Sequence, residues 1–188
     1  MASATEFTTG ITIIILAGGK SSRMGEDKGL ISLYEKPMVE HVLDVAKKIS
    51  NQIIIISNNA NYGKFGFPVY RDTFKEKGPL AGIYEGLSKS STEKNVVLSC
   101  DVPYIKTELL TFLIENSDNN DITIPVHGDR VHPLIGVYSK NCILVLEAQI
   151  KAGQLKVTDS FDNLVVNYVK VDQFDALMFK NINSKRDL

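Results

Sequence analysis

The feature that most constrains the fold is a short apolar run that ends abruptly in glycines near the start of the chain. Ile11–Leu16 is rich in β-branched residues and is followed by Ala17-Gly18-Gly19. A run of this length with glycine at its end is typical of a buried strand in a parallel sheet. Glycines also let backbone amides approach phosphate oxygens, and successive amides in a tight loop form an anion-binding concavity. The segment therefore predicts an α/β protein with a phosphate site after its first strand.

The rest of the chain alternates between strand and helix patterns. Apolar runs predict strands over 53–56, 68–70, 95–99, 121–125, 133–138 and 165–171. Helical spacing predicts helices over 37–49, from Gly78 onward, over 107–116 with Thr107 as candidate N-cap, over 141–151 and over 173–179. This alternation predicts a three-layer α/β/α, Rossmann-like fold with a mostly parallel sheet. No linker or repeat interrupts it, so we expect one domain over 11–188 after a flexible lead over 1–10.

The charge balance and the cysteines narrow the class of protein. Lys and Arg total 21 against 22 Asp and Glu, which argues against a generally nucleic-acid-binding surface. Cys100 and Cys142 suit neither a disulfide framework nor a metal site. No apolar run approaches the roughly 20 residues that span a bilayer, and residues 1–10 lack the basic cluster of a signal or transit peptide. We therefore expect a cytoplasmic protein with neither a membrane nor a nucleic-acid partner.

Ligands of open α/β sheets bind outside the carboxyl ends of the strands, and this rule selects residues 17–25, 57–61 and 100–103. In the first segment, Arg23 and Lys28 add positive charge to the glycine-rich loop. A P-loop is excluded, because Ile14 stands where its first glycine would be, and the spacing of a dinucleotide-binding loop is absent too. The alternative is a Gly-rich turn with solvated charges.

Asp101 follows the strand over 95–99 and Cys100. An acidic residue at the carboxyl end of a strand is well placed to hold Mg²⁺ against a triphosphate. A helix-capping or turn aspartate is the alternative interpretation. Cys100 is expected to be a packing residue, because no basic partner accompanies it in the sequence.

Two further segments are less specific. Arg71-Asp72 ends the third strand, and Gly78–Gly82 fits a tight turn into a helix whose N-terminus points toward the site. A plain loop-to-helix junction would have the same sequence. His127 and His132 flank residues 128–130, where a polar hairpin turn is the more economical local account than contact with an anionic acceptor.

These segments, in this order, resemble the molybdenum cofactor guanylyltransferase family of the Rossmann-like nucleotidyltransferases. The resemblance extends from Ile11 to near the end of the chain. It is carried by Leu16–Gly19 with Arg23-Met24-Gly25 and Asp27-Lys28-Gly29, by Gly78-Pro79-Leu80-Ala81-Gly82, by Cys100-Asp101-Val102-Pro103-Tyr104, and more weakly by Asp129–Pro133 and Asn181–Ser184. The first loop is shared with sugar, cytidylyl and guanylyl transferases of the wider superfamily. Asp27-Lys28-Gly29 together with Gly78-Pro79-Leu80-Ala81-Gly82 narrows the resemblance to the guanylyltransferase family.

The resemblance implies Mg²⁺-dependent transfer of GMP from GTP to molybdopterin bearing molybdenum, with release of pyrophosphate. Carried over by position, the first glycine-rich segment would border guanine and ribose, Arg23 and Lys28 would hold the phosphates, Asp72 the nucleoside, and Asp101 the nucleotide and Mg²⁺. The residues that would border guanine and ribose are Leu16, Ala17, Gly18 and Gly19. An asparagine usually follows the second strand of the family, and we place it at Asn59 rather than Asn58. The acceptor side would comprise Arg130, His132, Asn181 and Asn183.

Other functions remain open at this stage. The same fold could use CTP on the same acceptor, or a sugar phosphate as acceptor, and Gly18-Gly19 favours a purine only weakly. A non-catalytic nucleotide-binding or regulatory domain is opposed by the retention of Arg23, Lys28 and Asp101. Molybdenum enzymes or cofactor-delivery proteins are expected as transient partners. Because the chain stops at Leu188, we expect the helix after Asn183 to be short.

Overall fold

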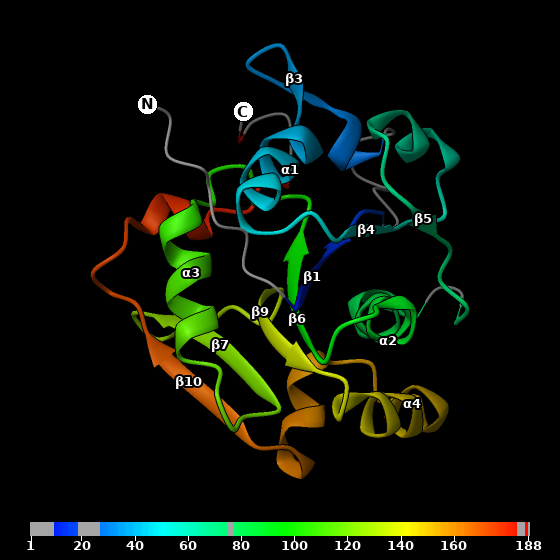
Figure 1. The fold of residues 1–188 in the computed structure, drawn as a ribbon, viewed down its shortest axis with the longest axis vertical. Helices are drawn as coiled ribbons and strands as arrows, with labels where there is room; N and C mark the ends of the chain where they lie inside the picture. The colour runs from blue at the N-terminus through cyan, green and yellow to red at the C-terminus, as the bar shows by residue number, and fades with distance from the viewer. Residues whose placement is uncertain (1–9, 19–26, 75–76, 184–186, 188) are drawn as a thin grey trace.

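A three-layer α/β/α architecture is confirmed by the computed structural model, which describes residues 10–18, 27–74, 77–183 and 187. The main sheet of this part of the chain has the order β10-β7-β9-β6-β1-β4-β5, and β8 pairs with β7. Helices α1 and α3 cover one face and α2 and α4 the other (Figure 1). The strands are β1 (Ile11–Leu16), β4 (Ile53–Ile56), β5 (Val69–Tyr70), β6 (Lys94–Ser99), β7 (Ile122–His127), β8 (Arg130–Val131), β9 (Ile135–Ser139) and β10 (Val166–Lys170), and the helices α1 (Met38–Ile49), α2 (Gly78–Lys89), α3 (Thr107–Glu115) and α4 (Cys142–Ala152).

Strand β1 lies inside the sheet, between β6 and β4, and is buried on both faces, which explains why all its residues except Thr12 are apolar. Ile13 and Ile15 pack under α1 and α3, whereas Ile14 packs under α2 and α4. The strand runs parallel to both neighbours, β4 and β6. Its last residue, Leu16, pairs with Ile56 and with Ser99. The carboxyl ends of three strands are therefore level at one edge of the sheet.

Helix α2 approaches β1 unusually closely, because glycines face the sheet. A Cβ on Gly82 would lie 3.2 Å from Leu16 Cδ2, and one on Gly86 would overlap Ile14 Cγ2. Pro79 stands in the first turn of α2, where its missing N–H is not needed. The predicted start of this helix at Gly78 is confirmed, and its N-terminus faces the carboxyl ends of the strands.

Antiparallel pairing enters on the other side of the sheet. Strand β9 is antiparallel to both β6 and β7, whereas β10 is parallel to β7. The short β8 folds back on β7 through a turn at Gly128, whose φ is 57°. The hairpin interpretation of residues 128–130 is thus confirmed, and the sheet remains mostly parallel around β1.

Several local predictions differ from the structure. Thr107 is not an N-cap: it is the first helical residue of α3, Lys106 is the cap, and no side-chain cap bond forms. The helix predicted over 173–179 is a 3₁₀ turn, η4 (Ala176–Phe179). The loop before α1 contains an unpredicted hairpin of β2 (Ser32–Leu33) and β3 (Lys36–Pro37). Its central residues, Tyr34 and Glu35, both have positive φ, as in a type I′ turn, without the usual Gly or Asn signal.

The N-terminal lead predicted over 1–10 falls outside the described residues, apart from Gly10. Among the described helices, none has the length and apolar character that would carry it across a membrane.

We expect Gly86→Ala to destabilise the protein although alanine favours helix by about 1 kcal/mol. The added methyl group would overlap the buried Ile14 side chain, and overpacking of this kind costs roughly 1–3 kcal/mol. Urea unfolding should show a lower free energy of unfolding. Ser88→Ala, on the exposed face of the same helix, is the control and should change little. Equal stability of the two variants would contradict the close-packing account.

Candidate functional site

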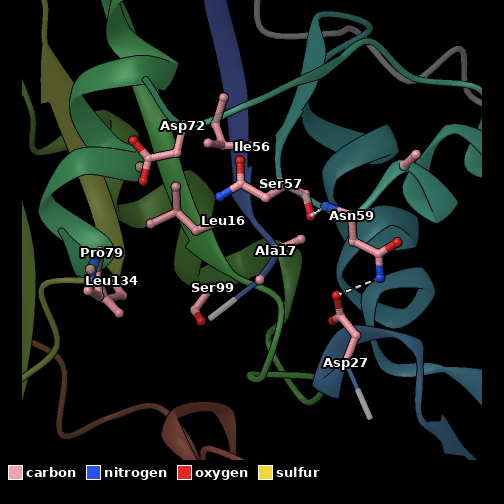
Figure 2. Close-up of a pocket in the computed structure, with 15 residues that line it drawn as sticks. Leu16, Ala17, Asp27, Ile56, Ser57, Asn59, Asp72, Pro79, Ser99 and Leu134 are labelled. Atoms are coloured by element: carbon pink, nitrogen blue, oxygen red, sulfur yellow. Dashed lines mark hydrogen bonds between the residues drawn. The ribbon is translucent and has the colours of Figure 1, made fainter. Parts of the chain in front are cut away.

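A pocket of about 890 Å³ opens at the edge where β1, β4 and β6 end, against the start of α2 (Figure 2). This is where ligands of open α/β sheets are expected. Its lining is mixed, with apolar side chains on the floor and carboxylates and amides on the rim. The lining residues are Leu16, Ala17, Gly18, Asp27, Ile56, Ser57, Asn58, Asn59, Ala60, Asp72, Gly78, Pro79, Gly82, Ser99 and Leu134.

The end of β1 forms the floor of this pocket. The Ala17 amide donates to the Ile56 carbonyl at 2.9 Å, and the Leu16 carbonyl accepts from the Cys100 amide at 3.0 Å. Gly18 has a φ of 133°, which L side chains rarely adopt, so glycine is required for the chain to leave the strand in this direction. The structure thus places the predicted Leu16, Ala17 and Gly18 in the pocket. Gly19 and Arg23, predicted for the same loop, lie outside the described residues.

Asp27 and Asn59 form the wall beyond the ends of β1 and β4. Asn59 Nδ2 donates to Asp27 Oδ2 at 3.0 Å, while Asn59 Oδ1 accepts from the Asn61 amide at 3.0 Å and so caps η2 (Ala60–Phe65). Asp27 was not among the residues predicted to bind the nucleotide, yet it lines the pocket. In the sequence, the one feature that marks Asp27 is its position directly before Lys28. The tertiary fold is what places its carboxylate at the pocket wall.

Asp72 stands on the opposite wall, just after β5 (Figure 2). Its Oδ1 accepts from the Phe74 amide at 2.9 Å. Burial raises the pKa of Asp72, and the nearby Glu85 adds to the rise, while the Phe74 amide opposes it. Gly78 and Pro79 of α2 line the same side of the pocket, so the predicted Arg71-Asp72 and Gly78–Gly82 segments do meet.

Asp101 lies two residues after the end of β6, and the C-terminal segment is hydrogen-bonded to its backbone. The Asp101 carbonyl accepts from the Ile182 amide at 2.9 Å, and Lys28 Nζ donates to Asn183 Oδ1 at 2.9 Å. The fold therefore brings together Lys28, Asp101 and Asn183, which are far apart in sequence. In the described part of the chain, Asp101 Oδ1 is buried and has no hydrogen-bond partner. It caps no helix, because Lys106 is the cap of α3.

A buried carboxylate oxygen without a partner is costly, and a hard cation is the kind of ligand that would satisfy it. Among the described residues no three His, Cys, Asp or Glu side chains cluster as a metal cage. The neighbouring Cys100 is buried, and burial together with Asp101 and Asp27 raises its pKa to about 12. It is therefore a neutral thiol near pH 7 and packs in the core, as predicted.

The predicted acceptor residues are only partly brought together. The His132 ring packs against the Phe179 ring, with 4.7 Å between the ring centroids. The His127 ring packs against the same Phe179 ring, with 4.9 Å between centroids. Within the described structure, His132 Nε2 is buried and has no hydrogen-bond partner. Arg130 and Asn181 are exposed, and no hydrogen bond between described residues links their side chains to the pocket.

Residues 13–164 match the family described as the MobA-like NTP transferase domain. The chain belongs to this family. It is 38% identical over 179 residues to a protein of Flavobacterium johnsoniae named as a probable molybdenum cofactor guanylyltransferase, covering 95% of this chain and 94% of that protein. It is 35% identical over 180 residues to the molybdenum cofactor guanylyltransferase of Vibrio parahaemolyticus, covering 93% and 91%. Among solved structures, molybdopterin-guanine dinucleotide biosynthesis protein A of Archaeoglobus fulgidus matches with a TM-score of 0.81 at 27% identity, covering 94% of each chain.

For a MobA-like NTP transferase, the pocket at the carboxyl ends of β1, β4 and β6 is the expected place of the nucleotide. Five of the predicted nucleotide residues line it: Leu16, Ala17, Gly18, Asn59 and Asp72. Lys28 and Asp101 stand beside the C-terminal segment instead. The roles of these residues toward a bound nucleotide stay predictions.

The environment of His132 predicts how the free energy of unfolding depends on pH. Burial, with smaller contributions from His127 and Arg130, lowers the pKa of His132 below its ordinary value of 6.5. The unfolded chain then binds more protons than the folded protein in mild acid, so the free energy of unfolding falls as the pH drops below 6.5. His132→Gln should reduce this fall between pH 7 and 5, measured by urea unfolding at each pH. An identical slope in parent and variant would contradict the buried, neutral imidazole.

Proposed function

We propose that the protein transfers GMP from GTP to molybdopterin bearing molybdenum, forming the molybdopterin guanine dinucleotide cofactor and pyrophosphate in the cytoplasm. The observation that carries the proposal is the open pocket at the carboxyl ends of β1, β4 and β6, which Leu16, Ala17, Gly18, Asn59 and Asp72 line. Lys28 and Asp101 meet the C-terminal segment, and Asp101 Oδ1 is buried without a hydrogen-bond partner among the described residues. The names of the relatives support guanine as the base and molybdopterin as the acceptor class.

The proposed step is an in-line attack by a phosphate oxygen of the acceptor on the α-phosphorus of GTP. The new oxygen–phosphorus bond forms as the bond to the β-phosphate breaks, and the electron pair leaves with pyrophosphate. A phosphate nucleophile is already ionised near pH 7, so no general base is required. Such transfers depend on positioning and on charge neutralisation more than on covalent help from the protein.

The residues of the site are suited to positioning the phosphates and neutralising their charge. Lys28 would neutralise charge on the phosphates in the ground state and in the transition state, together with Arg23 and the amides of the glycine-rich loop. The Lys28–Asn183 hydrogen bond joins the nucleotide side to the C-terminal segment, where the acceptor would bind near Asn181 and Asn183. Arg130 and His132 complete the proposed acceptor side.

Asp101 is the residue that would hold Mg²⁺. Its buried Oδ1, which has no hydrogen-bond partner among the described residues, fits a cation that prefers oxygen ligands. A single carboxylate is sufficient here, since Mg²⁺ commonly keeps several waters and takes its remaining ligands from substrate phosphates. When bound, the ion would supply positive charge against the phosphates that react and leave.

Base selectivity tests the proposal against its nearest rival, a cytidylyltransferase of the same fold. The backbone at Ala17 and Gly18, which line the pocket, would offer carbonyl acceptors to guanine N1–H and its exocyclic amine. Each acceptor left unpaired by the wrong base costs roughly 1–3 kcal/mol. We therefore expect GTP to be used about a hundredfold better than CTP. The assay supplies each of the four nucleoside triphosphates with molybdopterin and follows pyrophosphate release.

Substitution of Gly18 by a bulkier residue should erode this preference, because its φ of 133° strains any side chain and its Cβ would lie 3.5 Å from Ser57 Oγ. Equal use of CTP and GTP by the parent protein would refute the guanylyl assignment and leave a nucleotidyltransferase. Absence of pyrophosphate release with every nucleotide would instead favour a non-catalytic nucleotide-binding domain.

We expect Asp101→Ala to abolish turnover without loss of the fold. Removal of a metal anchor should cost on the order of 10³-fold or more in rate. The free energy of unfolding should not fall, because the lost oxygen has no partner among the described residues. Asp118→Ala is the matched control: its carboxylate pairs with Lys94 at the opposite end of β6. Near-normal Mg²⁺-dependent activity of Asp101→Ala would refute the metal assignment.

A further inference from the structure

We propose that Tyr62 is a positioning residue of the nucleotide site: through the Asp27 carboxylate it fixes the backbone that presents Lys28. The inference rests on the role proposed above for Lys28 at the phosphates. Tyr62 directly follows the predicted site segment 57–61, and its aromatic character alone gives no sign of a role at the site.

Tyr62 is fully buried in the part of the core beneath α1 and α3. Its ring belongs to η2, which follows β4, and its hydroxyl donates a short hydrogen bond to Asp27 Oδ1. Burial, with additional contributions from Cys100 and Asp27, raises the pKa of Tyr62. The hydroxyl therefore stays protonated and remains a donor. The Tyr62 side chain itself has no exposed surface, so its hydroxyl does not exchange this partner for water.

The Asp27 carboxylate is held by three donors. Its Oδ1 accepts from Tyr62 and, at 3.2 Å, from the Gly29 amide, while its Oδ2 accepts from Asn59 Nδ2 at 3.0 Å. Asn59 also caps the 3₁₀ turn that carries Tyr62. Two side chains from the segment after β4 thus fix one carboxylate from the segment after β1. Figure 2 shows Asn59 and Asp27 meeting in this way at the wall of the pocket.

The Tyr62 hydroxyl also explains why the residue after Lys28 is a glycine. A Cβ on Gly29 would overlap the Tyr62 hydroxyl oxygen and lie 3.0 Å from Cys100 Sγ. The space over Gly29 is therefore filled by side chains from the segments that follow β4 and β6. Asp27, as N-cap, and Gly29 bracket Lys28 at the start of η1 (Lys28–Leu30), so the backbone of Lys28 is fixed on both sides.

Removal of the Tyr62 hydroxyl leaves Asp27 Oδ1 with one donor, the Gly29 amide. The backbone on either side of Lys28 is then held less firmly. The Lys28 ammonium would still reach Asn183, but from a less defined backbone. A cation that neutralises the phosphates in the ground state, and more strongly in the transition state, should then bind GTP more weakly and promote transfer less well. The expected signature is a rise in KM and a fall in kcat together, as for a milder form of Lys28→Ala.

The experiment compares Tyr62→Phe with Ser50→Ala in the full chain. Ser50 is also buried, and its hydroxyl donates to the Ile11 carbonyl at 2.7 Å, at the opposite end of β1 from the pocket. Each variant loses one buried hydroxyl, so both should be less stable to urea. Only Tyr62→Phe should weaken GTP binding, measured by calorimetry, by about tenfold, the order expected for one hydrogen bond to a charged group.

Lys28→Ala completes the test. If Tyr62 acts through Lys28, then Tyr62→Phe should change GTP affinity by less than about twofold in the Lys28→Ala background. An equal effect in both backgrounds, or an effect of Tyr62→Phe no larger than that of Ser50→Ala, would overturn the inference while the proposed function stands. Normal GTP binding by Lys28→Ala would overturn the role of Lys28 itself.

Gly29→Ala supplies a second route if Tyr62→Phe does not fold. The added methyl group displaces the hydroxyl from Asp27 without removing it. It should weaken GTP binding in the parent, and parental affinity in a folded Gly29→Ala variant would count against the proposal.

Discussion

The site depends first on the register of one strand between two parallel neighbours. Leu16 pairs with Ile56 on one side and with Ser99 on the other, so the chain leaves β1, β4 and β6 at the same level. Backbone hydrogen bonds continue this alignment beyond the strands, from Ala17 to Ile56 and from Cys100 to Leu16. Because side chains alternate along a strand, a slip of one residue would move Ile14 into the opposite half of the core. Burial on both faces therefore fixes the geometry of the pocket.

A second level of order joins the loops that leave these strands. The Asp27 carboxylate accepts from Tyr62 and Asn59 after β4, and the Tyr62 hydroxyl occupies the space over Gly29 beside Cys100. Loops on the surface are ordinarily the most mobile parts of a fold. Here the polar donors of one loop are buried against the carboxylate of another, so the position of Lys28 is decided by contacts with a segment more than 30 residues away.

Five buried side-chain polar atoms in the described region have no hydrogen-bond partner, and two of them belong to predicted site residues. Asp101 Oδ1 and His132 Nε2 are both buried without a hydrogen-bond partner there. Buried groups of this kind reduce stability by roughly 1–3 kcal/mol each. A core built for stability alone would pair or remove them, whereas a site that receives a cation or an anionic substrate needs them available. Under the proposed function, the protein would therefore give up some stability at the two residues that a cation or the acceptor would contact.

The sequence by itself determined the layers, the buried β1 and the glycine-rich exit at Gly18, because these depend on local apolar periodicity and on backbone freedom at one residue. It failed at the cap of Thr107 and at the β2–β3 hairpin, where tertiary contacts override weak local signals. Only the tertiary structure decided that Asn183 meets Lys28, that Tyr62 reaches Asp27 and that Asp101 Oδ1 is buried without a partner among the described residues. These are contacts between side chains distant along the chain, and no periodicity within a single segment encodes which residues will meet when the loops pack against one another.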